Sequence, residues 1–123
     1  MDGIPQQAKL KLESQRNIWL ATTRPNNRPH LVPVWFAWYH GKIYVCVEPG
    51  SVKARNIERL AEVVLALEEG VHPVICEGKA AAVPPPWPEA LSVIFKQKYD
   101  WEISIDTQYT RLLEITPQKW LVW

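Results

Sequence analysis

Ser51, Lys53 and Asn56 place a hydroxyl, an ammonium and an amide at the start of an expected helix. Such a helix start also presents backbone N–H groups without intrahelical partners and the positive end of the helix dipole. Together these groups favour an anion, and a phosphate is the natural occupant. Lys53 and Asn56 are about one helical turn apart, so both are predicted on one exposed side, whereas Arg55 points elsewhere. The same spacing is also typical of an ordinary N-capped surface helix.

A second feature is Pro33, which lies inside the apolar and aromatic run from His30 to Tyr39. The run predicts one long strand. Because proline has no N–H to donate to a ladder, this strand should be an edge or should contain a bulge or a break. Backbone groups of Val34 and Trp35 would then be available to bond the edge of a heteroaromatic ring. A plain edge strand explains the proline equally well.

The rest of the sequence predicts short strands joined by tight turns, with few helices. Strands are expected over residues 18–23, 30–39, 42–47, 63–68, 74–83, 110–116 and 119–123, and helices over 8–16, 52–62 and 88–99. In the second helix, Ser51 is the expected N-cap, and the core-facing stripe is Ala54, Ile57, Leu60 and Ala61. This pattern favours a mainly β protein, an antiparallel β-barrel with peripheral helices, over a parallel α/β sheet. An open α+β sheet is the alternative.

Composition narrows the classes of function. The 123 residues fit a single domain over 1–123, and 14 Lys and Arg against 13 Asp and Glu do not favour a nucleic-acid partner. The sequence contains neither a signal-peptide pattern nor an apolar run long enough for a membrane helix, so we expect a cytoplasmic protein. Cys46 and Cys76 are expected as reduced, buried thiols, and no metal-ligand spacing is evident.

Seven tryptophans are more large rings than a core of this size can hide. Some of them should therefore line a ligand or an interface, and a homodimer is the simplest interpretation. For Tyr99 and Trp101, packing at a dimer interface is favoured over contact with a substrate.

Three segments together resemble a known family. They are Trp19-Leu-Ala-Thr-Thr-Arg-Pro-Asn-Asn-Arg-Pro-His-Leu-Val-Pro-Val-Trp-Phe36, Ile43-Tyr-Val-Cys-Val47 and Ser51-Val-Lys-Ala-Arg-Asn56. In this order they resemble the flavin-binding split-barrel family related to pyridoxamine 5′-phosphate oxidase, especially its short FMN- or deazaflavin-dependent members. The resemblance implies a six-stranded antiparallel Greek-key split barrel. It also implies a homodimer whose two cofactor sites lie at the subunit interface.

The resemblance also implies a set of cofactor-binding residues. Pro33, Val34 and Trp35 would border the isoalloxazine ring, Cys46 and Val47 would contact the cofactor from the next strand, and Ser51, Lys53 and Asn56 would hold the FMN phosphate. Val47 stands where many relatives carry threonine, which removes a hydroxyl donor.

The activity implied is hydride transfer between FMN and an unidentified small organic substrate, with no catalytic acid or base assigned. Pyridoxamine phosphate itself is not the expected substrate, because Trp120-Leu-Val-Trp123 offers no Arg or His for its phosphate. A deazaflavin-dependent reductase of the same fold and a non-catalytic flavin-binding or storage protein are the alternatives.

Overall fold

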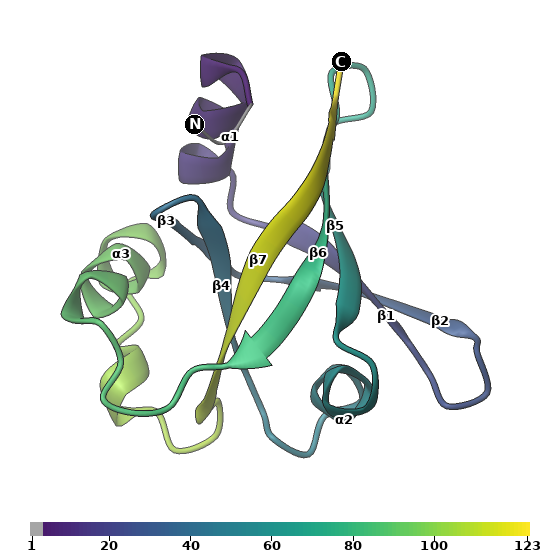
Figure 1. Ribbon diagram of the computed structural model, residues 1–123. Helices are drawn as coiled ribbons and strands as arrows, with labels where there is room; N and C mark the ends of the chain where they lie inside the picture. The colour runs from purple at the N-terminus through teal and green to yellow at the C-terminus, as the bar shows by residue number, and fades with distance from the viewer. Residues whose placement is uncertain (1–3) are drawn as a thin grey trace.

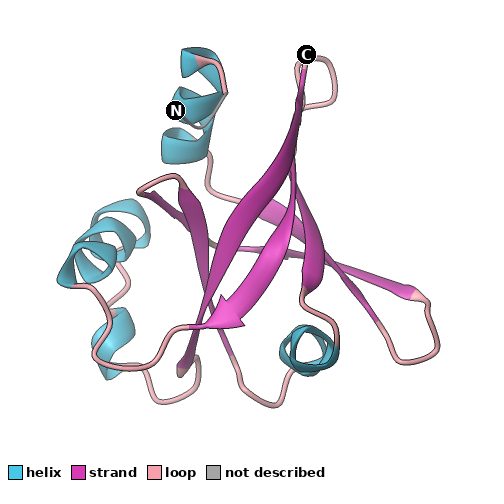
Figure 2. Ribbon diagram, viewed as in Figure 1, coloured by secondary structure: helices cyan, strands magenta, loops and turns pink. Residues whose placement is uncertain are grey.

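The computed structural model describes residues 4–123 as a curved antiparallel sheet flanked by helices (Figures 1 and 2). The strands are β1 (Ile18–Thr23), β2 (Pro29–Val34), β3 (Ala37–Tyr39), β4 (Lys42–Val47), β5 (Glu62–Leu67), β6 (Val74–Ala82) and β7 (Arg111–Val122). The helices are α1 (Gln6–Ser14), α2 (Val52–Arg59), α3 (Glu89–Tyr99) and the short 3-10 helix η1 (Ile103–Ile105). The prediction of a mainly β protein is confirmed. Within the described part of the chain, no helix is long and apolar enough to cross a membrane.

The seven strands form one sheet in the order β2-β1-β5-β6-β7-β4-β3. The end strands β2 and β3 are separated in sequence only by Trp35 and Phe36. Because so short a connection joins opposite ends of the sheet, the sheet has to curl, and Figure 1 shows it as a strongly bent half-barrel. The six strands implied by the family resemblance were wrong, since the described residues form seven.

Two clusters of buried side chains lie on the two faces of this curved sheet. The main core inside the curl is built from apolar residues of nearly every strand together with α1 and α2, and the second cluster lies between α3 and the outer side of β3, β4 and β7. Strand β4 contributes to both, because Val45 and Val47 enter the main core while Tyr44 and Cys46 face α3. Burial on both faces explains why β4 reads as a continuous apolar run.

The run from residue 30 to 39 was predicted as one strand, but the structure divides it. β2 ends at Val34 and β3 begins at Ala37. Between them, the N–H of Phe36 donates to the hydroxyl of Tyr99 at 3.0 Å instead of to a neighbouring strand. Pro33 lies on β2, which is an edge strand paired only with β1, so the edge expected from the proline is confirmed.

The two strands predicted over 110–116 and 119–123 are in fact one continuous strand, β7. Gly78 pairs with Pro117 and Glu77 pairs with Lys119, so a bulge on β7 accommodates the proline. A Cβ atom at Gly78 would lie 2.6 Å from the carbonyl oxygen of Thr116, which explains why glycine stands opposite the bulge. The second helix is shorter than predicted, because the chain enters β5 at Glu62.

Candidate functional site

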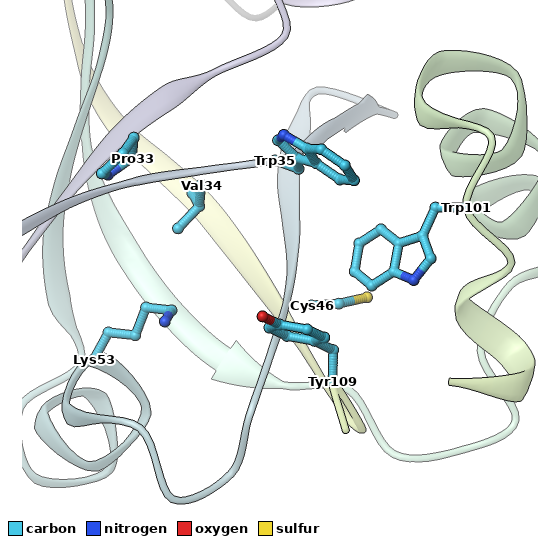
Figure 3. A pocket seen from close by; sticks show the side chains of 7 residues that line it. All are labelled: Pro33, Val34, Trp35, Cys46, Lys53, Trp101 and Tyr109. Atoms are coloured by element: carbon cyan, nitrogen blue, oxygen red, sulfur yellow. The ribbon is translucent and has the colours of Figure 1, made fainter. Parts of the chain in front are cut away.

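A cavity of about 380 Å³ opens where the end of β2 meets β4, the first turn of α2 and the segment between α3 and β7. Its lining consists of Pro33, Val34, Trp35, Cys46, Lys53, Trp101 and Tyr109, whose side chains are drawn in Figure 3. The structure thus brings together five of the eight residues proposed from sequence as cofactor contacts. Trp101 and Tyr109 complete the lining from the irregular segment that follows α3.

Aromatic rings form one side of the cavity. The rings of Trp35 and Trp101 are 5.9 Å apart and inclined by 69°, and those of Trp101 and Tyr109 are 5.7 Å apart at 87°. Such edge-to-face contacts are favourable for aromatic pairs and restrict how each ring can turn. Trp101 was expected to pack at a dimer interface, yet within the described chain it is a wall of the cavity.

Asp106 holds the aromatic side of the cavity in place through hydrogen bonds. Its carboxylate accepts hydrogen bonds from the indole N–H of Trp101 at 2.9 Å and from the backbone N–H groups of Gln108 and Tyr109, each at 2.8 Å. The bond from the N–H of Tyr109 contributes most to lowering the pKa of Asp106, followed by the bonds from Trp101 and Gln108. The carboxylate is therefore ionised at neutral pH, and it fixes both ring positions.

The opposite side of the cavity carries positive charge. Ser51 is the N-cap of α2, as predicted, and its hydroxyl oxygen accepts the N–H of Ala54 at 3.3 Å. This cap places Lys53 in the first helical turn with its side chain half-buried. Figure 3 shows the Lys53 ammonium and the Tyr109 hydroxyl turned toward each other across the cavity.

Arg24 extends this positive region toward His30, and sequence reasoning assigned neither residue to the site. Burial lowers the pKa of His30, and the charges of Arg24 and Lys53 lower that pKa further. The imidazole is thus neutral at neutral pH, and its buried Nδ1 has no hydrogen-bond partner among the described residues. The sequence held no signal for this arrangement, because Arg24 lies in a turn and only the β1–β2 pairing returns His30 to the vicinity of α2.

Three of the residues proposed from sequence do not line the cavity. Val47 is fully buried in the main core, on the face of β4 opposite to Cys46. The Ser51 hydroxyl donates to the carbonyl of Glu48 at 2.8 Å, so its proton is already engaged. Asn56 was predicted on the exposed side of α2 beside Lys53, but it is only 4% exposed, and its amide donates to the Thr22 hydroxyl at 3.0 Å.

Cys46 supplies the sulfur at the floor of the cavity. Burial raises the pKa of this thiol to about 12, with a smaller contribution from Asp106. The thiol is therefore protonated at neutral pH and acts as a small apolar surface rather than as a nucleophile. Cys76 is also buried and free, so the expectation of two buried thiols is confirmed. No cluster of three or more His, Cys, Asp or Glu side chains within residues 4–123 could hold a metal ion.

This arrangement suits a flat ligand with an anionic end. Aromatic and aliphatic surfaces would cover the faces of a ring, and the exposed edge of β2 lies alongside them with backbone groups available for polar contacts. The Lys53 ammonium and the N-terminus of α2 lie at the other side, where a phosphate would be stabilised.

Comparison with known proteins identifies the family of the chain. The family model described as pyridoxamine 5′-phosphate oxidase matches residues 4–123. No curated protein matches the chain in sequence. Among solved structures, an F420 reductase superposes with a TM-score of 0.78 at 21% identity, over 96% of this chain and 98% of its own.

Two further structures are similar. The conserved hypothetical protein Rv2991 from Mycobacterium tuberculosis has a TM-score of 0.77 and 26% identity, covering 99% of this chain and 86% of its own. The heme storage protein HutZ from Vibrio cholerae has a TM-score of 0.79 and 17% identity, covering 94% of this chain and 92% of its own. One backbone arrangement thus occurs in proteins whose names refer to different ligands.

Proposed function

Because the chain belongs to the pyridoxamine 5′-phosphate oxidase family, we propose that it is a flavin-binding oxidoreductase that holds FMN in the cavity of Figure 3 and acts in the cytoplasm. The observation that carries this proposal is the position of Lys53, whose ammonium faces an otherwise apolar and aromatic cavity at the N-terminus of a helix. An ammonium placed there has no evident structural purpose, but it would neutralise the charge of a bound phosphate.

The residues present fit the two halves of FMN. Trp35, Trp101 and Tyr109 offer the surfaces that a planar ring needs, and Pro33 and Val34 border it from an edge strand. Lys53 would bind the phosphate, with Arg24 adding positive potential nearby. When bound, the flavin supplies hydride chemistry, and the protein contributes binding, orientation and electrostatics. The protonated Cys46 thiol would shield the ring from water without entering the reaction.

A homodimer is part of the proposal, since the outward face of the sheet is apolar and lies next to the cavity. The strand register places Trp19, Leu31, Pro33, Val64 and Ala66 on this face. Leu31 is 59% exposed and Val64 is 41% exposed, although buried positions are the norm for such side chains in a monomer. Pro33 also lines the cavity, so a second copy docked on this face would cover the cavity mouth.

Arg24 favours a second candidate, a deazaflavin coenzyme with a longer anionic tail. Such a tail requires positive charge that continues beyond Lys53, and Arg24 lies close enough to His30 to lower its pKa. Both Arg24 and Arg59 also donate to backbone carbonyls, those of Pro29 and Thr23, but only Arg24 acts on the pKa of His30 together with Lys53. Competition between FMN and the deazaflavin coenzyme for the purified protein would decide between the two. A loaded protein that turns over no reductant or acceptor would instead indicate a storage role.

The decisive experiment compares FMN with riboflavin, which lacks the phosphate. The absorption spectrum of the purified protein first identifies any flavin, deazaflavin or heme that it carries. Calorimetric titration then measures both ligands. We expect Lys53→Ala to weaken FMN binding by about 1–3 kcal/mol and to leave riboflavin binding almost unchanged, because only FMN offers a charged partner.

Arg55→Ala is the matched control, since it removes one positive charge from the same helix turn at an exposed position. It should change neither affinity by more than a few tenths of a kcal/mol. Equal losses of FMN and riboflavin in Lys53→Ala would contradict the assigned phosphate contact. Absence of FMN binding to the unmodified protein at about millimolar ligand would overturn the proposal as a whole.

A further inference from the structure

We propose that Tyr99 is a positioning residue for the cavity, because it holds the connection between β2 and β3 and thereby fixes the orientation of Trp35. Tyr99 is the last residue of α3 and does not line the cavity itself. The proposal relies on the proposed function only for the identity of the planar ring that Trp35 would face.

The first step concerns the backbone of the connection. Trp35 and Phe36 lie outside the strands, so the sheet does not supply their hydrogen bonds. The N–H of Phe36 donates to the Tyr99 hydroxyl oxygen at 3.0 Å, and the same hydroxyl donates to the carbonyl of Arg16 at 2.7 Å. A single phenol therefore joins α3 both to the β2–β3 connection and to the residues that lead into β1.

The second step concerns the carbonyl of Phe36. It lies 3.2 Å from the Tyr99 hydroxyl, but a hydroxyl has one proton and the Arg16 oxygen is closer. The ammonium of Lys98 donates to this carbonyl at 3.2 Å and lies 3.7 Å from the centre of the Phe36 ring. Two neighbouring side chains at the end of α3 thus satisfy both backbone groups of a fully buried residue, as a buried peptide unit requires.

The third step links this arrangement to the cavity. The ring of Trp35 stacks on the ring of Tyr99, with centroids 4.5 Å apart and planes inclined by only 7°. Trp35 remains 44% exposed, so Tyr99 supports one face of the indole while another part of it borders the cavity. Because the hydroxyl fixes the backbone and the ring supports the side chain, Tyr99 determines where the aromatic wall stands.

Tyr99→Phe tests this directly, since it keeps the stacked ring and removes only the hydroxyl. Circular dichroism in the far ultraviolet detects an exciton couplet from neighbouring tryptophans, and this couplet reports the geometry of the rings without any ligand. Both the Trp35–Trp101 pair and the Trp38–Trp120 pair contribute to it, and the signal lost in Trp35→Phe gives the contribution of the first pair. We expect Tyr99→Phe to lose most of the Trp35–Trp101 contribution to the couplet and to bind FMN about tenfold more weakly. Lys98→Met, which leaves the Tyr99 bonds in place, should lose part of the couplet.

Tyr44→Phe is the matched control. It also removes a phenol hydroxyl from a buried tyrosine, which donates to Glu114 at 2.8 Å, but Tyr44 contacts neither Trp35 nor the cavity. The couplet and the FMN affinity should both survive this change. A retained couplet in Tyr99→Phe, or equal losses of affinity in Tyr99→Phe and Tyr44→Phe, would overturn the positioning role. If the unmodified protein binds no FMN, the proposed function fails while the couplet still decides the role of Tyr99. If Tyr99→Phe does not fold, Lys98→Met tests whether the bonds from α3 to the β2–β3 connection orient Trp35, and a fully retained couplet in that variant would overturn the positioning role.

Discussion

The hydrogen bond between Asn56 and Thr22 assigns Asn56 to the core, and its strength can be measured. Both side chains are buried, with exposures of 4% and 2%, and the amide nitrogen lies 3.0 Å from the hydroxyl oxygen. Thr22→Val replaces that hydroxyl with a methyl group of similar size and leaves a buried amide donor unpaired. An unpaired buried donor costs about 1–3 kcal/mol, so we expect a loss of unfolding free energy of about 2 kcal/mol.

A double-mutant cycle isolates the bond itself. Asn56→Ala should also cost about 2 kcal/mol, and the double variant should cost about 1 kcal/mol less than the sum, because the bond can be lost only once. Urea unfolding followed by circular dichroism, at one fixed protein concentration, gives these free energies. Thr23→Val is the control, since the Thr23 side chain is only half-buried and its hydroxyl forms no hydrogen bond among residues 4–123. It should change stability by less than about 0.5 kcal/mol.

The same variants separate a core role from a phosphate contact. If Asn56 belongs to the core, Asn56→Ala lowers the affinities for FMN and riboflavin by the same factor. The reasoning is refuted if Asn56→Ala leaves stability unchanged, shows no coupling to Thr22→Val and weakens FMN alone. That result would support the phosphate contact that the helical spacing predicts for Asn56.

Two further predictions concern the oligomer and the end of α3. Leu31→Lys places a charge on the proposed interface, so it should shift the protein toward monomer in analytical ultracentrifugation. Leu10→Lys on α1 changes a residue of similar exposure and should cause no such shift. Equal behaviour of the two variants would argue against this face as the interface. Burial, aided by Arg16, lowers the pKa of Lys98 from 10.5 to about 8, so between these values the unfolded chain binds more protons and unfolding free energy rises with pH. From pH 7 to 9.5 the unfolding free energy of the unmodified protein should therefore rise by about 1 kcal/mol relative to that of Lys98→Met, a value that includes a reduction for solvent screening. Urea unfolding at several pH values measures this difference, and parallel pH profiles of the two proteins would contradict the lowered pKa of Lys98.

Sequence patterns predicted local features of the fold well. Strands 18–23 and 42–47 were predicted with their observed bounds, and Ser51 was predicted as the cap of α2, because alternation, turn residues and capping act over a few neighbouring residues. The division between β2 and β3 was missed because its cause lies elsewhere in the chain. Phe36 leaves the ladder for the hydroxyl of Tyr99, a partner that no local pattern identifies.

The candidate site was predictable to a similar extent. Residues near Pro33 and Lys53 were found because proline and a helix start are strong local signals, and the structure brings them to one cavity. The exposed position predicted for Asn56 was wrong, because residues three apart on a helix differ by about 60° in direction, enough to turn one toward the cavity and the other into the core. Tyr109 was missed because its position depends on Asp106 and on the docking of a segment without regular structure.

The place of β7 in the sheet has a consequence for the order of folding. Strand β7 pairs with β6 on one side and β4 on the other, and Tyr109 lies two residues before its start. A chain still being synthesised therefore lacks an interior strand of its sheet and one wall of its cavity until residues 109–122 have emerged. Contacts of such wide sequence separation form slowly, because closing the long loops costs entropy first. Ligand capture would then occur only after β7 has inserted, and the bound ligand would stabilise the completed sheet against release of that strand.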